Sequence, residues 1–355
     1  LEFRRVLFRS ILKARNMKAI RIHDNGGPEV LRWEDCELPP PGTGEVRVRH
    51  SAIAVNFSDV NVRRGGFYIA NPQRYPLIIG NEGAGVVSAF GPGGAEIAAA
   101  SGIALGDRVA YVGSGGPFYE NTGSYAEERN LPARCLLKLP EGSSDQIAAA
   151  LLLKGLTAAM VINRVYTPKP GDTILIHAAS SGVGLLLTQW SRHLGATVIG
   201  TVGSPEKAKL AKKAGAKHVI LYNEENFVVR VNQITKGRKC DVVYDGVGKA
   251  TFPGSLDCLR MLGTFVSFGS SSGQVDAFNI GILQQKGSLF ATRPTLFHYI
   301  AKREDLEAMA KDLFKVVKSG EVVIPIHARY KLDDVAEAHR ALESRATTGA
   351  AVLIP

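Results

Sequence analysis

The segment 173–187, TILIHAASSGVGLLL, predicts a β-strand, a tight turn of small residues and the start of a helix. Dinucleotide-binding folds hold a pyrophosphate on this arrangement, because small residues let the backbone approach the phosphates and the first N–H groups of the helix receive their charge. The glycines are Gly182 and Gly184, with Ala179 and Ser181 where the GxGxxG fingerprint has its first two glycines. Taken alone, the motif also fits a glycine turn that merely joins a strand to a helix.

The residues that follow repeat this unit. Apolar residues continue at helical spacing over 185–194, and a second buried-strand run follows within about thirty residues, as in a nucleotide-binding unit. Strands are predicted at 196–201, 218–221, 241–245, 264–268 and 288–292, and helices at 207–214, 227–235 and 252–262. This alternation predicts an α/β fold with a doubly wound parallel sheet, whose ligand lies across the carboxyl ends of the strands.

The end of the second strand indicates which dinucleotide binds. An NAD site usually carries an acidic residue about twenty positions beyond the glycine turn, where it accepts hydrogen bonds from ribose hydroxyls. This chain has TVGSPEK at 201–207, with Gly203 and Ser204 as an open floor and Lys207 one helical turn away. Because Lys207 can donate a charge-assisted hydrogen bond to a 2′-phosphate, the segment favours NADPH. If Glu206 and Lys207 are ordinary solvated residues, either cofactor would bind.

Length and composition fit a two-domain enzyme. The chain has 355 residues, of which 45% are hydrophobic, enough to bury a large core. Its closest approach to a membrane span, 147–162, is interrupted by Lys154 and falls short of about eighteen apolar residues, so we expect no membrane partner. The four cysteines are far apart and form no CxxC pair, which indicates reduced thiols in a cytoplasmic protein.

The formal charge of +10 is partly local. Residues 1–16 carry five basic side chains against Glu2, a net +4, which leaves +6 for the rest of the chain. This segment precedes MKAI at 17–20, which has the form of a natural start. We therefore interpret residues 1–16 as a non-native or upstream leader and exclude them from the fold; an Arg-rich transit peptide is the alternative.

The residues on either side of the nucleotide unit have a different pattern. Residues 17–142 contain short alternating segments, such as 46–51 and 85–89, between Gly/Pro turns, which predict a compact, mostly β domain. Residues 293–355 hold two helical stretches and end in AVLI at 351–354. A terminal strand usually needs a sheet to join, so we expect this tail to return to the first domain.

Several motifs share a wider pattern; they include AVNFSDVNVRRGGFY, GNEGAGVV, HAASSGVGLLLTQW, VVYDGVGK, QKGSLFATRP and ESRATTGAAVLIP. From Met17 to Pro355 the chain resembles the zinc-independent NADPH:quinone oxidoreductases of the medium-chain dehydrogenase/reductase superfamily. The resemblance implies a GroES-like, mostly β catalytic domain at 17–153 plus 293–355, with a Rossmann NADPH-binding domain at 154–292 inserted in it. It also implies a homodimer, formed by pairing edge strands near 288–292.

The resemblance allows a test for zinc. Alcohol dehydrogenases of the superfamily hold a catalytic zinc with a Cys, a His and a second Cys, whereas the matching segments here present Asn56, Asn81 and Lys154. None of these supplies the thiolate or imidazole that zinc prefers, and the four-Cys structural lobe is also missing from 112–128. We therefore predict no metal site. Oxidation of ordinary alcohols is not expected without a Lewis acid, whereas reduction of an electron-poor acceptor is.

The family reaction transfers a hydride from the nicotinamide, so the protein must align the acceptor, exclude water and stabilise oxyanion charge. Asn56 and Tyr68 are the catalytic candidates, because an amide and a phenol can both donate to that charge. Tyr68 is equally well explained as a loop aromatic on the surface. Asp59 fits a structural acceptor better than a base, and Lys154 fits either a cofactor contact or a solvated lysine.

The cofactor contacts that the resemblance implies fall at the predicted strand ends and near the C-terminus. They are Asn56, Thr157, Gly182, Val183, Gly184, Ser204, Lys207, Tyr222, Val247, Gly248, Phe268, Gly269, Ser271 and Arg345. Within this set, the residues that the resemblance implies for binding the 2′-phosphate are Ser204, Lys207, Tyr222 and Arg345. Ser181 and Gly246 replace the usual glycine and serine of the family, which affects details of phosphate contact rather than the fold.

Three functions are compatible with these residues. The first is reduction of a quinone by NADPH, and the second is reduction of a 2-alkenal or enone, since both acceptors are flat, conjugated and electron-poor. The third, a nucleic-acid-binding or crystallin-like structural role, is disfavoured because no basic strip with interleaved aromatic residues is visible and the surplus charge is dispersed.

Overall fold

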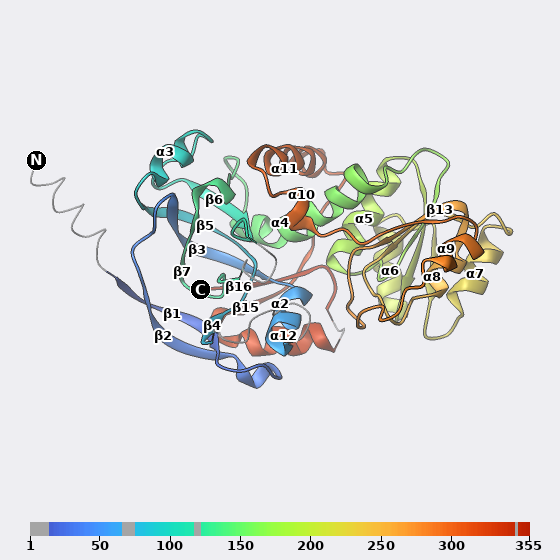
Figure 1. Cartoon of the computed structure of the whole chain (residues 1–355), viewed down its shortest axis with the longest axis horizontal. Helices are drawn as coiled ribbons and strands as arrows, with labels where there is room; N and C mark the ends of the chain where they lie inside the picture. Colours follow the sequence, from blue (N-terminus) through green and yellow to red (C-terminus); the bar gives the residue numbers. More distant parts are fainter. Residues whose placement is uncertain (1–13, 66–74, 117–121, 345–346) are drawn as a thin grey trace, which may run out of the picture. The chain divides into compact units, whose positions relative to one another are not determined.

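A computed structural model describes residues 14–65, 75–116, 122–344 and 347–355. The chain divides into two compact units (Figure 1). Unit 1 comprises Leu1–Leu153, Ile300–Glu307 and Ile326–Pro355, and unit 2 comprises Lys154–Tyr299 and Ala308–Pro325. The segment 293–355, which we expected to lie wholly in the first domain, therefore contributes to both units.

A seven-stranded sheet forms the centre of unit 1, in the order β15-β16-β3-β5-β6-β8 with β7 paired to β3. The strands are β3 (Glu45–Val55), β5 (Glu82–Phe90), β6 (Arg108–Val112), β7 (Glu128–Pro132), β8 (Leu136–Lys138), β15 (Ile326–Lys331) and β16 (Ala350–Ile354). β16 is the C-terminal tail, and its Ala351 lies opposite Val55 of β3. The tail thus joins the β-rich part of the chain, as the sequence predicts.

A smaller sheet in unit 1 contains β1 (Arg15–Ile22), β2 (Arg32–Leu38) and β4 (Leu77–Ile78). β1 begins inside the segment that we interpreted as a leader. Arg15 lies opposite Leu38 and Asn16 opposite Glu37, so these two residues belong to the sheet, and our exclusion of all of residues 1–16 was wrong for them. An extended backbone next to an open strand gains ladder hydrogen bonds whatever its side chains are.

Helices α2 (Phe57–Arg64) and α12 (Val335–Glu343) pack on one core cluster of unit 1. Val62 of α2 and Val335 of α12 meet Ile53 and Leu353 from the central sheet, and all four are buried. Burial of this apolar surface, worth roughly 25 cal/mol per Å², fixes α2 against α12 although α12 begins 271 residues after α2 ends.

Six parallel strands form the sheet of unit 2, in the order β11-β10-β9-β12-β13-β14. They are β9 (Thr173–Ile176), β10 (Thr197–Val202), β11 (His218–Leu221), β12 (Cys240–Asp245), β13 (Leu259–Ser267) and β14 (Phe290–Thr292). The order runs outward in both directions from the pair β9 and β12, where doubly wound sheets bind their ligands. The predicted Rossmann-type parallel sheet is confirmed.

The remaining helices connect these strands (Figure 1). They are α3 (Gly94–Ala99), α4 (Asp145–Met160), α5 (Gly182–His193), α6 (Pro205–Lys213), α7 (Phe227–Ile234), α8 (Gly254–Asp257), α9 (Gly281–Gln285), α10 (Leu296–Tyr299) and α11 (Arg303–Lys318). The predicted helix at 252–262 is wrong, because α8 is short and Leu259 already pairs with Cys240 in the parallel ladder. Its apolar residues fit either element, and the neighbouring strand decides between them.

Helix α4 continues into a π-helical turn, Val161–Val165. Among the described residues, this combined stretch, Asp145–Val165, is long and apolar enough by length and composition to cross a membrane. It is longer than the apolar run that we considered in the sequence. Most of this stretch is buried inside the structure. The core helix of a soluble protein meets the same criterion of length and composition.

Candidate functional site

The turn between β9 and α5 is shaped by backbone contacts. Ser181 caps α5, since its hydroxyl oxygen accepts a hydrogen bond from the Gly184 N–H at 3.1 Å. A Cβ on Gly184 would lie 2.2 Å from the carbonyl oxygen of Ala178, so only glycine fits at this close approach. Gly182, Val183 and Gly184 thus form the first turn of a capped helix, the arrangement that binds a pyrophosphate.

The end of β10 brings together the residues expected to hold a 2′-phosphate. Ser204 caps α6 and accepts a hydrogen bond from the Lys207 N–H at 3.4 Å. A Cβ on Gly203 would lie 2.7 Å from the hydroxyl oxygen of Tyr222, so this ring sits directly against the floor that Gly203 provides. The Ser204 cap, the first turn of α6 with Lys207, and the Tyr222 ring therefore lie next to one small-residue floor. Tyr222 is 40% exposed and can meet a ligand there.

The loops that follow β12 and β13 are joined by backbone hydrogen bonds. The Phe268 N–H donates to the Asp245 carbonyl at 2.8 Å, and the Ser271 N–H donates to the Gly246 carbonyl at 3.2 Å. A Cβ on Gly269 would lie 2.6 Å from the Gly246 carbonyl oxygen. We call residues 246–248 and 268–273 the paired loops; they contain five of the expected cofactor contacts.

Asp245, at the end of β12, holds one of the paired loops in place. Its buried carboxylate accepts hydrogen bonds through Oδ1 from the Val247 N–H at 2.8 Å and the Gly248 N–H at 3.0 Å. Oδ2 accepts from the hydroxyls of Thr251 at 2.7 Å and Ser255 at 2.8 Å. A carboxylate with four such donors fixes the direction of the loop that follows it.

His177 extends this polar network beneath the turn after β9. Its Nε2 lies 3.1 Å from the Ser255 hydroxyl, which donates to Asp245, and its Nδ1 lies 2.9 Å from the Thr201 hydroxyl. Because Ser255 gives its hydrogen to the carboxylate, it accepts from Nε2–H of the imidazole. Burial lowers the pKa of His177, which keeps the ring neutral. The network ties β9, β10 and β12 together at one edge of the sheet.

These segments all follow strands of one parallel sheet, so they share its carboxyl edge. The structure therefore brings together most of the expected cofactor contacts, namely Gly182, Val183, Gly184, Ser204, Lys207, Tyr222, Val247, Gly248, Phe268, Gly269 and Ser271. Thr157 belongs to the same unit but lies on α4, one turn beyond Lys154.

In unit 1, Asn56 is the N-cap residue of α2 and is buried. Its backbone N–H donates to Asp59 Oδ2 at 2.8 Å, and its side-chain Nδ2 donates to Glu82 Oε1 at 2.7 Å. The other carboxyl oxygen of Glu82 accepts from the Leu153 N–H at 2.6 Å. Both the backbone and the amide of Asn56 are therefore held, so the side chain has one orientation.

The three positions that correspond to zinc ligands carry two amides and an amine. Asn81 is fully buried, and neither polar atom of its amide has a hydrogen-bond partner among the described residues. A buried amide without a partner costs about 1–3 kcal/mol in proteins, which indicates a place where a water or ligand oxygen binds. Among the described residues no group of three or more His, Cys, Asp or Glu is placed to hold a metal.

A chain of buried polar side chains links α12 to α2, and we call it the Asp59 network. Arg63 pairs with Glu343 at 2.6 and 3.1 Å and lies 3.2 Å from Nδ1 of His339. The Tyr125 hydroxyl lies 3.0 Å from His339 Nε2 and donates to Asp59 Oδ2 at 2.9 Å. All but Glu343 are fully buried. Asp59 thus acts as a structural acceptor, as the sequence favours.

Two expected site residues, Tyr68 and Arg345, lie outside the described residues. The sequence did not identify Glu82, Asp245 or the unpartnered amide of Asn81 as site residues. A carboxylate directly after a buried strand is a usable signal for Asp245. Glu82 and Asn81 carry no such signal, because their roles depend on partners from distant segments.

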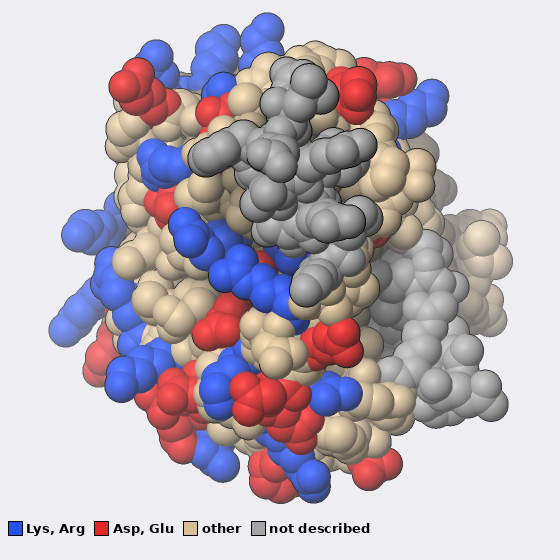
Figure 2. Space-filling model, turned by 90° about the vertical axis from the view of Figure 1, so that its left-hand side faces the viewer, with Lys and Arg blue, Asp and Glu red and all other residues tan. Residues whose placement is uncertain are grey.

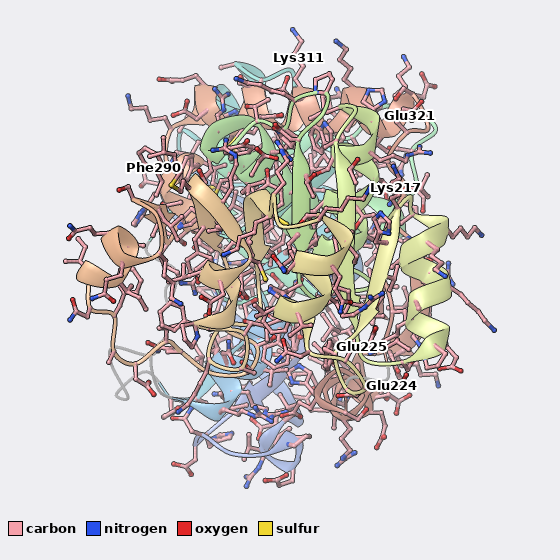
Figure 3. All side chains as sticks on the ribbon, turned by 90° about the vertical axis from the view of Figure 1, so that its right-hand side faces the viewer. Lys217, Glu224, Glu225, Phe290, Lys311 and Glu321 are labelled. Carbon is pink, nitrogen blue, oxygen red and sulfur yellow. The ribbon has the colours of Figure 1, made fainter. Side chains whose placement is uncertain are left out.

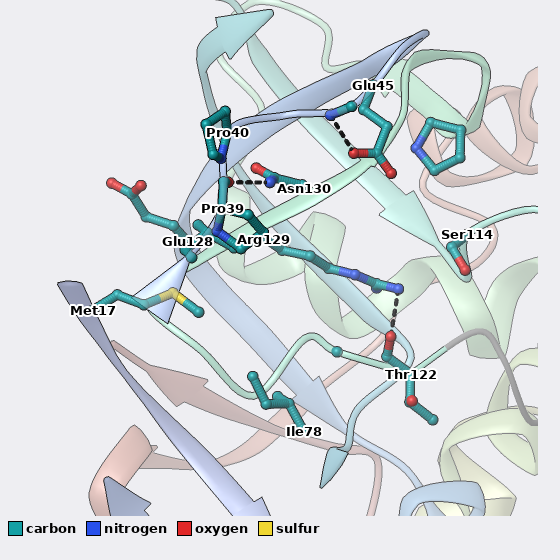
Figure 4. A pocket seen from close by; sticks show the side chains of 14 residues that line it. Met17, Pro39, Pro40, Glu45, Ile78, Ser114, Thr122, Glu128, Arg129 and Asn130 are labelled. Carbon is teal, nitrogen blue, oxygen red and sulfur yellow. Dashed lines mark hydrogen bonds between the residues drawn. The ribbon is translucent and has the colours of Figure 1, made fainter. Parts of the chain in front are cut away.

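A cavity of about 660 Å³ lies in unit 1 (Figure 4). Its lining includes Met17, Ile78, Glu128, Arg129 and Asn130, and none of the expected site residues is among the residues that line it. Arg129 is committed to structure, since it donates to the Thr122 carbonyl at 2.6 Å. This cavity therefore contributes nothing to the candidate site.

The burial of His339 predicts how the free energy of unfolding depends on pH. Burial, followed by the Arg63 charge, lowers the pKa of His339 to about 3, against about 6.5 in an unfolded chain. Between pH 6.5 and 3 the unfolded chain binds this proton and the native chain does not, so stability falls as pH falls. We expect His339→Gln to reduce the slope of unfolding free energy between pH 6 and 4 by about 1.4 kcal/mol per pH unit.

Urea unfolding at several pH values measures this slope. His298→Gln is the matched control, because His298 is exposed, and it should keep the wild-type slope. Equal slopes for wild type and His339→Gln would contradict the assignment of His339 as a buried neutral group.

Two family models match the chain. The model of the alcohol dehydrogenase GroES-like domain matches residues 42–141, and the model of zinc-binding dehydrogenases matches residues 182–315. The first match covers five strands of the central sheet of unit 1, β3 and β5 to β8, and the second begins at the first residue of α5.

The chain is also similar to characterised relatives along nearly its whole length. It is 46% identical to the quinone oxidoreductase of Pseudomonas aeruginosa, over 95% of this chain and 99% of the relative, and 40% identical to the 2-haloacrylate reductase of a Burkholderia species, over 94% and 98%. The structure of Escherichia coli quinone oxidoreductase complexed with NADPH matches with a TM-score of 0.88 at 43% identity, covering 95% of this chain and all of that one. The chain therefore belongs to the quinone oxidoreductase family, in the zinc-independent branch of the medium-chain dehydrogenase/reductase superfamily.

Proposed function

We propose that this chain is an NADPH:quinone oxidoreductase that transfers a hydride from NADPH to a quinone without a metal. The observation that carries the proposal is the identity to the quinone oxidoreductase of Pseudomonas aeruginosa, which is 46% over 99% of that protein's length. The carboxyl edge of the unit 2 sheet supports it, because the capped start of α5 suits a pyrophosphate and the first turn of α6 carries Lys207 beside the Gly203 floor.

The residues at this edge fit NADPH. The close approach at Gly184 packs the start of α5 against the turn after β9, and we assign the pyrophosphate to the first-turn N–H groups of Gly182 and Val183. We assign the 2′-phosphate to Ser204, Lys207 and Tyr222, because Ser204 and the first turn of α6 follow Gly203 directly and the Tyr222 ring lies against it. The remaining contacts we assign are Asn56, Thr157, Val247, Gly248, Phe268, Gly269, Ser271 and Arg345.

NADPH, when bound, supplies the hydride, and negative charge then develops on the acceptor oxygen. The role that we assign to Asn56 is to present an oriented amide to the acceptor or to a cofactor oxygen; Glu82 sets that orientation by accepting one Nδ2–H. Tyr68 is our second candidate donor. Burial of Asn56 and Asn81 excludes bulk water from these amides, which strengthens their hydrogen bonds to the acceptor.

Reduction of an activated alkene is the second candidate function. The 40% identity to a 2-haloacrylate reductase favours it, because a haloacrylate is an alkene conjugated to a carboxyl group. A quinone and such an alkene are both flat and electron-poor, so the same alignment serves either.

A substrate screen tests the quinone assignment. The purified chain, treated with a chelator and dialysed, is assayed for NADPH oxidation with 1,4-benzoquinone, 1,4-naphthoquinone, a short 2-alkenal and 2-haloacrylate. We expect the highest kcat/KM with a quinone and full activity after chelation. A preference for the alkenal or haloacrylate would overturn the quinone assignment, and activity that zinc alone restores would overturn the metal-free one.

The phosphate pocket gives a second prediction. Lys207→Ala removes a charge-assisted hydrogen bond worth about 1.5–3 kcal/mol, so kcat/KM for NADPH should fall about 10- to 150-fold while kcat/KM for NADH changes little. Lys209→Ala removes an exposed lysine from the same helix and should leave both values unchanged. A parallel loss with both cofactors in the Lys207 variant would show that the pocket is wrongly placed.

A nucleic-acid role gains no support from the surface. Figure 2 shows one face of the molecule, on which Lys and Arg side chains are interspersed with Asp and Glu. Several of the basic residues of unit 1 are paired with acids, as Lys138 is with Asp107 and Arg21 with Glu34. Over the described residues on this face, no continuous positive strip of the kind that tracks a phosphate backbone is visible.

We further propose that two copies pair through the edge strand β14. β14 ends the strand order of the unit 2 sheet, and its Phe290 is 61% exposed, close in the ladder to the exposed Met261 and Leu262. Figure 3 shows Phe290 at one side of the sheet and Lys217 at the other. An open edge with exposed apolar side chains suits a second copy of itself, related by a twofold axis.

Sedimentation velocity tests this pairing. The wild type should sediment as a dimer and Phe290→Asp as a monomer, because the new carboxylates would face each other across the interface. Val229→Asp, at a half-exposed position on α7, is the control and should remain dimeric. A monomeric wild type, or a dimeric Phe290→Asp, would refute pairing at β14.

Two broader assignments complete the proposal. We assign the catalytic domain to 17–153 plus 293–355 and the NADPH-binding domain to 154–292; the compact units differ from these bounds, because residues 293–299 and 308–325 belong to unit 2. We also assign the protein to the cytoplasm, because its four cysteines are all free. Fractionation of the producing cells, with recovery in the membrane pellet, would contradict this.

A further inference from the structure

The Asp59 network has only one arrangement of hydrogens. Arg63 is a donor in every contact, so His339 Nδ1 accepts from it and the neutral imidazole carries its proton on Nε2. Nε2–H then donates to the Tyr125 hydroxyl oxygen, and the hydroxyl hydrogen goes to Asp59 Oδ2. The reverse orientation would leave two N–H groups facing each other between Arg63 and His339. From Arg63 through His339 and Tyr125, each hydrogen bond therefore runs toward Asp59, while the other N–H groups of Arg63 donate to Glu343 and to the Gly26 carbonyl.

This arrangement does not carry protons between solvent and the site. Its outer end is the ion pair of Arg63 with Glu343, in which the guanidinium does not lose a proton and so blocks transfer, and its inner end is the backbone N–H of Asn56. A chain that is closed at both ends has a static role. What it determines is where the Asp59 carboxylate lies.

Asp59 is the point at which the network meets the candidate site. Its Oδ2 receives the Tyr125 hydroxyl at 2.9 Å and the Asn56 N–H at 2.8 Å. Asn56 is fixed a second time by Glu82 at 2.7 Å. The backbone and the amide of Asn56 are therefore set by separate carboxyl groups, and the Asp59 group is in turn set by residues from α12.

We infer that Tyr125 and His339 are positioning residues for the reaction: through Asp59 they fix the backbone from which the Asn56 amide is presented to the acceptor. This inference rests on the proposed function, in which Asn56 meets the acceptor or the cofactor. Displacement of a reacting group by about 1 Å can lower a rate about a hundredfold, so a loss of alignment would be visible in kcat.

Tyr125→Phe tests the inference with little change in volume. We expect kcat for the acceptor to fall roughly tenfold, while the Kd for NADPH, measured by calorimetry, stays within about twofold, because the phosphate-binding residues are untouched. Tyr244→Phe is the matched control: Tyr244 is a buried tyrosine whose hydroxyl donates to the Tyr166 carbonyl at 2.8 Å, without connection to Asn56. Tyr244→Phe should lower the urea midpoint of unfolding about as much as Tyr125→Phe does, but it should keep the wild-type kcat.

His339 supplies a test by rescue. In His339→Gln the amide oxygen can accept from Arg63 and the amide N–H can donate to Tyr125, as the neutral imidazole does. In His339→Leu neither bond forms. We expect kcat of His339→Gln to lie close to wild type and kcat of His339→Leu to match Tyr125→Phe.

The outcomes distinguish failure of the positioning role from failure of the proposed function. Wild-type kcat in Tyr125→Phe, or equal losses in Tyr125→Phe and Tyr244→Phe, would overturn the positioning role. If Asn56→Ala lowers kcat and Tyr125→Phe does not, only this inference fails. If Asn56→Ala leaves kcat unchanged, the role proposed for Asn56 fails with it, and a wild type that reduces neither quinone nor alkenal removes the proposed function itself.

Discussion

The contact between the backbone at Gly184 and the Ala178 carbonyl is the constraint on which the dinucleotide-binding edge depends. It brings the first turn of α5 onto the end of β9 at a distance that no Cβ allows. The Ser181 cap and the position of His177 below the turn both follow from this approach. Main-chain packing thus sets the turn after β9, while the side chains of Asp245 and His177 hold the neighbouring strand ends in place.

In unit 1, several charged side chains are buried near the candidate site. Arg63, Asp59 and Glu82 are fully buried, and each has several hydrogen-bond partners with defined donors. A buried ion pair adds little net stability when compared with apolar packing, but removal of one partner is costly. The arrangement therefore fixes one geometry around Asn56 and adds little to the stability of the unit.

The sequence predicted the parallel sheet and the cofactor edge because their signals are local. A strand, a small-residue turn and a helix start occur within fifteen residues, and Ser204 and Lys207 follow the next strand directly. The helix predicted at 252–262 was wrong because Leu259 takes its conformation from Cys240 on another strand. Glu82, Tyr125 and His339 could not be found in this way, since each acts on a partner far away in the sequence.

The paired loops have a consequence for how this family could change. Because residues 246–248 and 268–273 share a ladder of main-chain bonds, an insertion in one would break the register of the other. Their lengths are then coupled, and variation is confined to the side chains they display. Diversification of ligand preference at this rim should proceed by point substitution, whereas gains or losses of residues accumulate elsewhere on the surface.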